Sequence, residues 1–171
     1  MELSKVERLL LINQYSILGV LDPDNQNDYE LNKEILLQGY KQNYDDLIEW
    51  VLDDLPEEIS EEVIDILQMY RSLNFSYRGL DKKEKEKVDP EKLKFKGFDG
   101  NDETRYMVYA RFFMHKLERF EELWGEGKNP DYNTHHSTLS KYRRMLDTWK
   151  SISDRYDSNL SADKINRILE S

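Results

Sequence analysis

The sequence predicts an all-α, multihelical protein, and three observations support that fold class. Apolar residues recur at intervals of three and four in several separate stretches, which is the spacing of a buried helix face. Serine residues that can cap a helix precede several of these stretches, and glycine or proline follows several of them, where helices end. We expect about seven helices in a single domain over residues 1–171, with the option of two helical subdomains around one long central helix.

The first helix is predicted to begin at a capping box and to be broadly apolar. Ser4 and Glu7 have the spacing at which each side chain accepts from the other residue's backbone N–H group. The helix should end at Leu21, because Pro23 disfavours helical backbone in the residue before it. Segment 9–12 is apolar on more than one side, so we expect this helix to be buried broadly or to form an interface.

Three further helices are expected before residue 80. One runs over residues 28–38, where Gly39 is suited to the left-handed residue that follows a helix. Another is predicted over residues 40–54, and Pro56 interrupts it. The third should begin with Ser60 as its N-cap.

The composition changes at residues 79–96, where charged residues dominate. Segment 81–87 has no apolar partner, so it either extends a solvated helix or forms a flexible excursion. We expect the boundary here if the chain has two subdomains. The lysines could contact nucleic acid with Phe95 and Phe98 for stacking, but interleaved acids weaken the local field, and a solvated linker is favoured.

A glycine-bracketed turn at residues 97–100 leads into the longest predicted helix, at about residues 102–124. Asn101 or Asp102 can cap this helix, and Glu103 places negative charge at the positive end of its dipole. We expect it to be the central helix, because its apolar stripe is the longest and most aromatic in the chain. The stripe comprises Tyr106, Tyr109, Phe113, Leu117, Phe120 and Trp124.

Two more helices are predicted after a loop that runs from Gly125 to about residue 136. Ser137 or Thr134 can cap the first of them. Ser161 can cap the last, short helix, and Leu160 can pack against Ile165 at its start.

Composition limits the classes of function. The chain has 171 residues, a net charge of -10 and no cysteine, which excludes disulfides, thiolate catalysis and cysteine-ligated metals. The acidic balance disfavours general binding to nucleic acid or to anionic membranes. The sequence has no run of about 18 apolar residues that could span a membrane, so a cytoplasmic protein is the simplest expectation.

No constellation of residues predicts a catalytic, cofactor or metal site. His115 and Glu118 are three residues apart on a predicted helix, but a solvated polar pair is favoured over a metal site. The acidic turn 99–103 begins like a calcium loop, yet Thr104 and Ala110 occupy the positions that need glycine and a bidentate glutamate. The glycine-containing turns match neither a P-loop nor a dinucleotide fingerprint.

Several of these segments resemble the YfbU family of small bacterial proteins, and the match spans nearly the whole chain. The resemblance implies a multihelical fold and a homo-oligomer, but it implies no activity and supplies no catalytic residues. The segments that carry it are Asn13-Gln14-Tyr15, Leu21-Asp22-Pro23, Gly39-Tyr40, Ile64-Asp65-Ile66 with Met69-Tyr70, Gly97-Phe98-Asp99, Glu103 with Arg105-Tyr106, Arg111-Phe112, Lys141-Tyr142 with Arg144-Met145-Leu146, and Leu160-Ser161-Ala162 with Ile165-Asn166.

Two functional hypotheses follow. The first is a cytoplasmic interaction or regulatory module without catalysis. It would form a homo-oligomer, and a further protein partner is possible. Apolar surface on several sides of the first helix and abundant Tyr and Trp favour it, because such side chains are common at interfaces. The alternative is an enzyme or small-ligand binder with a pocket at the turn, and its contact residues would be Phe98, Asp99, Glu103, Arg105 and Tyr106.

Overall fold

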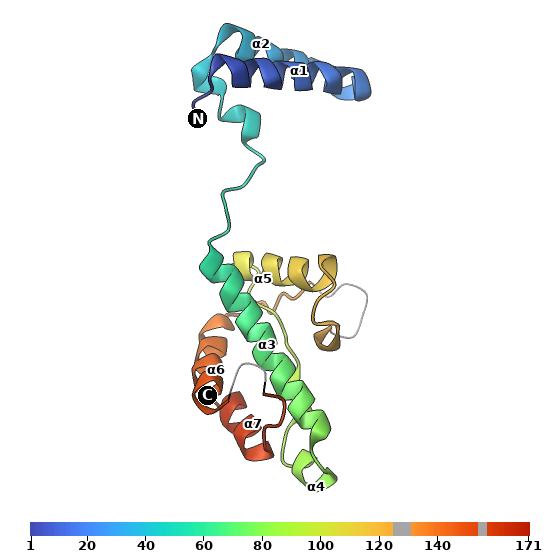
Figure 1. Ribbon diagram of the computed structural model, residues 1–171, viewed down its shortest axis with the longest axis vertical. Coiled ribbons are helices and arrows are strands. Elements are labelled where there is room, and N and C mark those ends of the chain that lie inside the picture. The colour runs from blue at the N-terminus through green and yellow to red at the C-terminus, as the bar shows by residue number, and fades with distance from the viewer. Residues whose placement is uncertain (125–130, 154–156) are drawn as a thin grey trace. The chain divides into compact units, whose positions relative to one another are not determined.

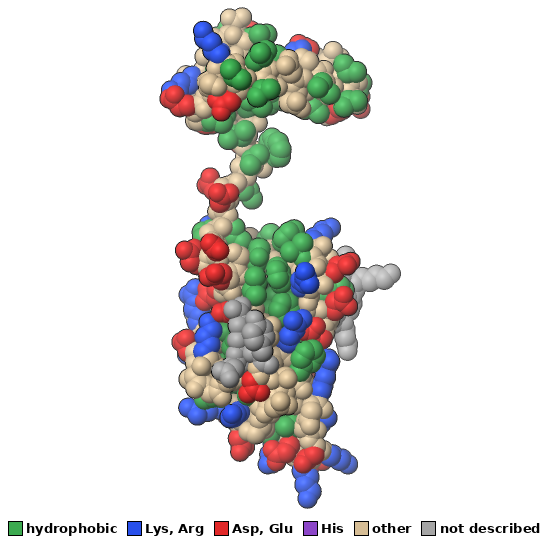
Figure 2. All heavy atoms as spheres, viewed as in Figure 1, with side chains coloured by type: hydrophobic (Ala, Val, Ile, Leu, Met, Phe, Trp, Pro, Cys, Tyr) green, Lys and Arg blue, Asp and Glu red, His purple; other side chains and the backbone are tan. Residues whose placement is uncertain are grey.

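A computed structural model describes residues 1–124, 131–153 and 157–171, and it confirms the all-α class (Figure 1). The chain divides into two compact units, unit 1 at Met1–Asp54 and unit 2 at Leu55–Ser171. The division therefore lies between Asp54 and Leu55, whereas the charged segment 79–96 lies within unit 2. Charged side chains of both signs cover much of the visible face of unit 2 (Figure 2). In the part of the chain that is described, no helix is both long and apolar enough to cross a membrane.

Unit 1 is built on a hairpin of two helices, α1 (Lys5–Leu21) and α2 (Gln26–Gln38), which lie side by side (Figure 1). The predicted capping box is present, because the Ser4 hydroxyl accepts from the Glu7 N–H at 3.2 Å and the Glu7 carboxylate accepts from the Ser4 N–H at 2.8 Å. Gly39 follows α2 with a φ of 73°, as predicted.

The prediction of a helix over residues 40–54 is wrong. Only short 3-10 turns form there, at Lys41–Asn43 and Asp46–Ile48. Polar side chains in this stretch compete with helical backbone bonds, and the Asn43 amide donates to the Asp46 carboxylate at 3.1 Å. The turns instead fold back to complete a small core, whose buried members are Leu36, Tyr44 and Leu47.

The central helix of unit 2 is α3 (Glu57–Gly79), which has 23 residues and takes the place predicted for residues 102–124. It begins directly after Pro56, because proline already has a helix-compatible φ and its missing N–H is not needed there. Ser60 is therefore inside the first turn and not the N-cap; its hydroxyl donates to the Glu57 carbonyl at 2.8 Å. α5 lies near the start of α3, α6 runs beside the first half and the middle of α3, and α7 lies farther toward its end (Figure 1).

The predicted central helix is broken after its first half. Its α-helical part is α5 (Thr104–Arg111), and a π-helical turn, η5 (Phe112–Lys116), follows. Glu118 and Phe120 then have φ angles of 52° and 54°, which a right-handed helix does not accommodate. The chain leaves the helical path because Phe120 is buried in unit 2, where the Arg71 guanidinium lies 3.9 Å from its ring centre.

The caps of the later helices are confirmed in one case and corrected in two. Thr138 occupies the N-cap position of α6 (Leu139–Ile152), where Ser137 or Thr134 was predicted. Glu103 occupies that position before α5, where Asn101 or Asp102 was predicted. The start of α7 (Ala162–Leu169) agrees with the prediction, because the Ser161 hydroxyl accepts from the Lys164 N–H at 3.4 Å. The loop predicted from Gly125 lies partly outside the described residues.

The charged segment 79–96 contains two short helical turns, α4 (Lys82–Lys85) and η4 (Pro90–Leu93). Its apolar members Val88, Leu93 and Phe95 are buried, so the segment is anchored to unit 2 by side chains spaced among its charges.

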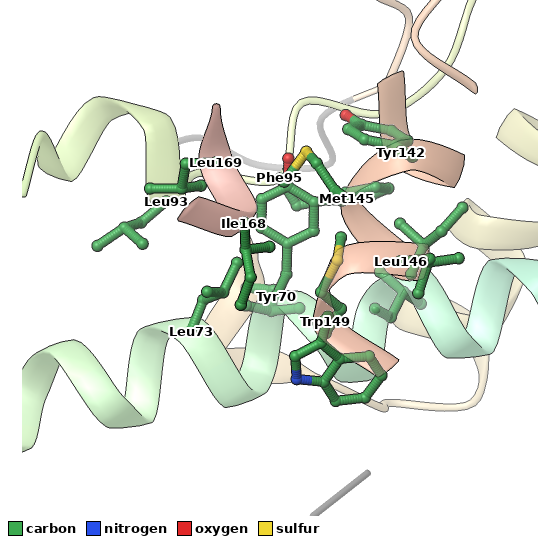
Figure 3. Close-up of a cluster of buried hydrophobic side chains, with 14 of the residues drawn as sticks. Tyr70, Leu73, Leu93, Phe95, Tyr142, Met145, Leu146, Trp149, Ile168 and Leu169 are labelled. Atoms are coloured by element: carbon green, nitrogen blue, oxygen red, sulfur yellow. The ribbon is translucent and has the colours of Figure 1, made fainter. Parts of the chain in front are cut away.

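The main core lies where α3, α6 and α7 meet the segment around Phe95 (Figure 3). Phe95 contacts the rings of Tyr70 and Tyr142, with centroids 5.6 Å and 5.9 Å away. Trp149 of α6 is almost fully buried, and its indole N–H donates to the Ser72 hydroxyl of α3 at 3.3 Å. Aromatic packing of this kind gives unit 2 a specific core.

Candidate functional site

The turn at residues 97–100 is held against a segment far along the chain. The Phe98 N–H donates to the Tyr132 carbonyl at 2.9 Å, and the Thr134 N–H donates to the Phe98 carbonyl at 3.0 Å. Gly97 has a φ of 100°, and a Cβ atom there would lie 2.0 Å from the Tyr132 carbonyl oxygen. Phe98 is fully buried, with its ring centre 5.6 Å from that of Tyr142. The turn is therefore a packed element that requires glycine at its start.

The Glu103 carboxylate ties this turn to the beginning of α6. Glu103 is 5% exposed, and it accepts hydrogen bonds from the Ser137 hydroxyl and from the backbone N–H groups of Asp99 at 3.0 Å, Thr138 at 3.0 Å and Leu139 at 2.8 Å. Burial raises the pKa of this carboxyl group, but those hydrogen bonds outweigh burial and lower the pKa to about 2. The carboxylate caps a helix whose first N–H groups lack partners of their own.

Tyr106 joins three helices through Glu62 of α3 and Arg143 of α6. The Tyr106 hydroxyl donates to one Glu62 carboxylate oxygen at 2.9 Å. Arg143 donates to the two oxygens of the same carboxylate at 2.7 Å and 2.9 Å. The Arg143 hydrogen bond lowers the pKa of Glu62, whereas burial and the bond to Glu62 raise the pKa of Tyr106.

The structure brings the predicted contact residues together, and it engages most of them in the fold. Phe98, Asp99 and Glu103 are buried, and the Asp99 carboxylate accepts from the Asn101 N–H at 2.9 Å within the turn. Arg105 is exposed at the surface of α5. A ligand pocket at this turn stays a prediction, and the geometry gives these side chains a structural role.

Unit 1 exposes more of the large apolar side chains than unit 2 does, and some of them are visible in Figure 2. All 17 residues of α1 are described, and none is buried. From Leu9 to Leu21 the helix carries no charged residue, although 35% of the chain is charged. Exposed apolar surface of this kind marks interaction sites on proteins. The exposed large apolar residues of unit 1 are Met1, Val6, Leu9, Leu10, Ile17, Leu18, Val20, Leu21, Leu31, Leu37, Tyr40, Ile48, Trp50, Val51 and Leu52.

The side chains of α1 form two opposite faces. The inner face packs on the small core of unit 1 through Leu11, Ile12 and Tyr15. The opposite face has residues spaced by four, three, four and three, which places them in line along a helix. We call this face the outer stripe; it consists of Val6, Leu10, Asn13, Ile17 and Val20, all of them exposed. Sequence reasoning predicted apolar surface on several sides of this helix but not which side stays open.

A second surface, which sequence reasoning missed, is a groove of about 490 Å³ along α5 and η5. Its walls carry Val108, Phe112, Arg111, Lys116 and the acidic Asp131, and neither Arg111 nor Lys116 forms an ion pair with another described residue. His115 also lines the groove, with its Nε2 atom 3.0 Å from the Tyr132 hydroxyl. The groove residues between 108 and 116 lie three or four positions apart, which is the spacing of one helix face. That spacing was the signal available in the sequence.

The described residues offer no group of three or more His, Asp and Glu side chains that could hold a metal ion. The fold and surfaces thus define an all-helical protein with a small N-terminal hairpin unit and an open apolar stripe. A family model described as the YfbU domain matches residues 1–171. The UPF0304 protein MJECS11 of Methanocaldococcus jannaschii is 37% identical over 169 residues, which cover 98% of each chain. The chain therefore belongs to the YfbU family.

Proposed function

We propose that this protein is a self-associating interaction or regulatory module of the cytoplasm, without catalysis of its own. The observation that carries the proposal is the outer stripe of α1, a line of exposed apolar side chains on a helix that buries no residue. Val20 and Leu10 are 78% and 58% exposed. Contact of these apolar side chains with water is unfavourable, so covering them with another surface lowers the free energy.

A second copy of the chain is the occupant that fits this surface. Unit 1 spans Met1–Asp54, and the core cluster of this unit contains three buried residues, Leu36, Tyr44 and Leu47. A unit of this size with so small a core needs further burial to be stable. A second hairpin supplies the same apolar face, and two hairpins together form the four-helix arrangement that such faces favour.

Substitution of Ile17 tests the proposal. We expect Ile17→Glu to convert a dimer into a monomer in sedimentation velocity at about 10 μM, because two charges would be buried in an apolar seam. Gln14→Glu is the matched control, since Gln14 is exposed on the same helix but lies outside the outer stripe. A wild-type chain that is monomeric at every concentration, or a dimer that both variants leave intact, would contradict self-association through this face.

The ion pairs of the charged segment 79–96 favour a solvated surface over a site that binds nucleic acid. Three of its seven lysines pair with acids in the described part of the chain: Lys94 lies 2.7 Å from Glu91, Lys87 is paired with Glu84, and Lys92 lies 3.9 Å from Glu170. Such local pairs leave little positive field to attract phosphate groups.

A second candidate function is binding of a small organic anion in the groove along α5 and η5. The observation that favours it is that Arg111 and Lys116, which form no ion pair with another described residue, flank the apolar side chains of Phe112 and Val108 and outnumber the one carboxylate of the groove, Asp131. The groove has the size of ordinary ligand sites. π-helical turns such as η5 also occur frequently at functional sites.

The test uses anilinonaphthalene sulfonate as a fluorescent aromatic anion and phenylnaphthylamine as its uncharged counterpart. We expect the double variant Arg111→Gln, Lys116→Gln to bind the sulfonate about tenfold more weakly, because each lost cation removes roughly 0.5–1 kcal/mol. The uncharged probe should be unaffected. The control is Lys82→Gln, Lys83→Gln, which removes the same charge from α4. Equal affinities in all three proteins would reject the groove as an anion site.

A further inference from the structure

We infer that two copies of α1 pack antiparallel across a two-fold axis that passes beside Asn13. This inference rests on the proposed self-association, and it adds the direction of the helices and the residue pairs that meet. It comes from the arrangement of the outer stripe, which is exposed along its whole length.

The outer stripe is nearly symmetric about Asn13. Val6 and Val20 lie seven residues before and after it, and Leu10 and Ile17 lie three before and four after it. A two-fold axis at Asn13 therefore pairs Val6 with Val20 of the partner subunit and Leu10 with Ile17 of the partner subunit. A shift of one helical turn in either direction would leave a valine at one end in water, so full burial of the apolar side chains selects this register.

Charge at the two ends of α1 selects the antiparallel direction over the parallel one. Asp22, Asp24 and Asp28 gather where α1 ends and α2 begins, whereas the start of α1 carries both Lys5 and Glu7. Parallel helices would bring the three aspartates of both copies together, and like charges at an interface are unfavourable. Antiparallel helices place each acidic end beside the near-neutral start of the partner and also oppose the helix dipoles.

Asn13 then has a specific role at the centre of the seam. Its side chain has both donor and acceptor groups, so two Asn13 amides that face each other across the axis can satisfy one another. A single polar pair in an otherwise apolar helix seam lowers stability but specifies the register. Asn13 is exposed in the single chain, which leaves its amide available for this pairing.

Single cysteines test the geometry cleanly, because the chain contains no cysteine of its own. We expect Asn13→Cys to form a disulfide-linked dimer on mild oxidation. Val6→Cys alone should not, because two copies of residue 6 would lie about 21 Å apart at roughly 1.5 Å per residue, and a disulfide needs Cα atoms within about 7 Å. A mixture of Val6→Cys with Val20→Cys should give the mixed dimer. Glu34→Cys, at an exposed position of α2, is the control for random collision.

The outcomes separate this inference from the proposed function when the same proteins, in reduced form, are also measured by sedimentation. Disulfide dimers of Val6→Cys alone and of Val20→Cys alone, in a protein that sediments as a dimer, mean parallel helices and overturn the inference. Dimers by sedimentation that no cysteine on the outer stripe traps place the interface elsewhere and overturn it as well. Monomers throughout reject self-association itself. The mixed Val6–Val20 disulfide with a trapped Asn13→Cys dimer establishes the antiparallel seam.

Discussion

Replacing Glu103 with glutamine is expected to destabilise unit 2 by roughly 3 kcal/mol at pH 7. The hydrogen bonds that the charged form accepts from Ser137 and three backbone N–H groups lower the pKa of Glu103 from 4.5 to about 2, and a shift of that size corresponds to a loss of this magnitude. Glutamine has the same shape but lacks the charge and turns an NH₂ group toward those donors. Urea unfolding followed by tryptophan fluorescence measures the loss, since Trp149 lies in the core of this unit.

The contribution of Glu103 should also depend on pH in a defined direction. A carboxyl group with a lowered folded-state pKa stabilises the fold fully above its unfolded value of 4.5 and progressively less as the pH falls toward about 2. The difference between wild type and Glu103→Gln should therefore be largest at neutral pH and shrink below pH 4.5. Glu61→Gln, an exposed carboxylate on α3, is the control and should change little. A difference that stays constant with pH would mean that shape, not charge, is responsible.

Gly97→Ala is expected to have an effect at least as large, on the order of 3 kcal/mol or more, or to prevent folding of unit 2. Two penalties add at this position. A left-handed φ of 100° is strained for any residue with a Cβ atom, and that atom would lie 2.0 Å from the Tyr132 carbonyl oxygen. The Phe98 to Tyr132 hydrogen bond, 2.9 Å long, would have to open to relieve the clash. Thermal and urea unfolding of the purified variant measure the loss.

Gly79→Ala provides the opposite expectation in the same protein. Gly79 is the last residue of α3, and a Cβ atom there meets nothing within 4 Å. Alanine should raise stability by about 0.5–1 kcal/mol, because it restricts the unfolded chain and favours helix. If the two glycine variants behave alike, the packing at Gly97 is not what makes glycine necessary there.

Features that depend on residues close in sequence were predictable. The Ser4 and Glu7 capping box, the left-handed Gly39 and the Ser161 cap each involve bonds across a few residues, so local residue types were sufficient. The all-α class followed from the spacing of apolar residues, which reports the period of the backbone directly.

Features that depend on distant partners were not predictable in the same way. The Glu103 carboxylate was assigned to its own helix, yet it caps α6 from 35 residues away. The long helix ends early because Phe120 is buried beside Arg71, and no residue near Phe120 in the sequence signals that contact. The predicted helix at residues 40–54 failed because Tyr44 and Leu47 complete the core of unit 1 instead.

The candidate interaction surface shows the same boundary between sequence and structure. By itself the sequence determined that the first helix is capped, uncharged from Leu9 to Leu21 and apolar on more than one side, because these properties belong to the residues and their period. Only the tertiary structure decided that, within unit 1, α2 packs on the Leu11 side of α1 and not on the outer stripe. Which face of a helix is buried depends on where its neighbour packs, and that choice is made by contacts between segments rather than within one.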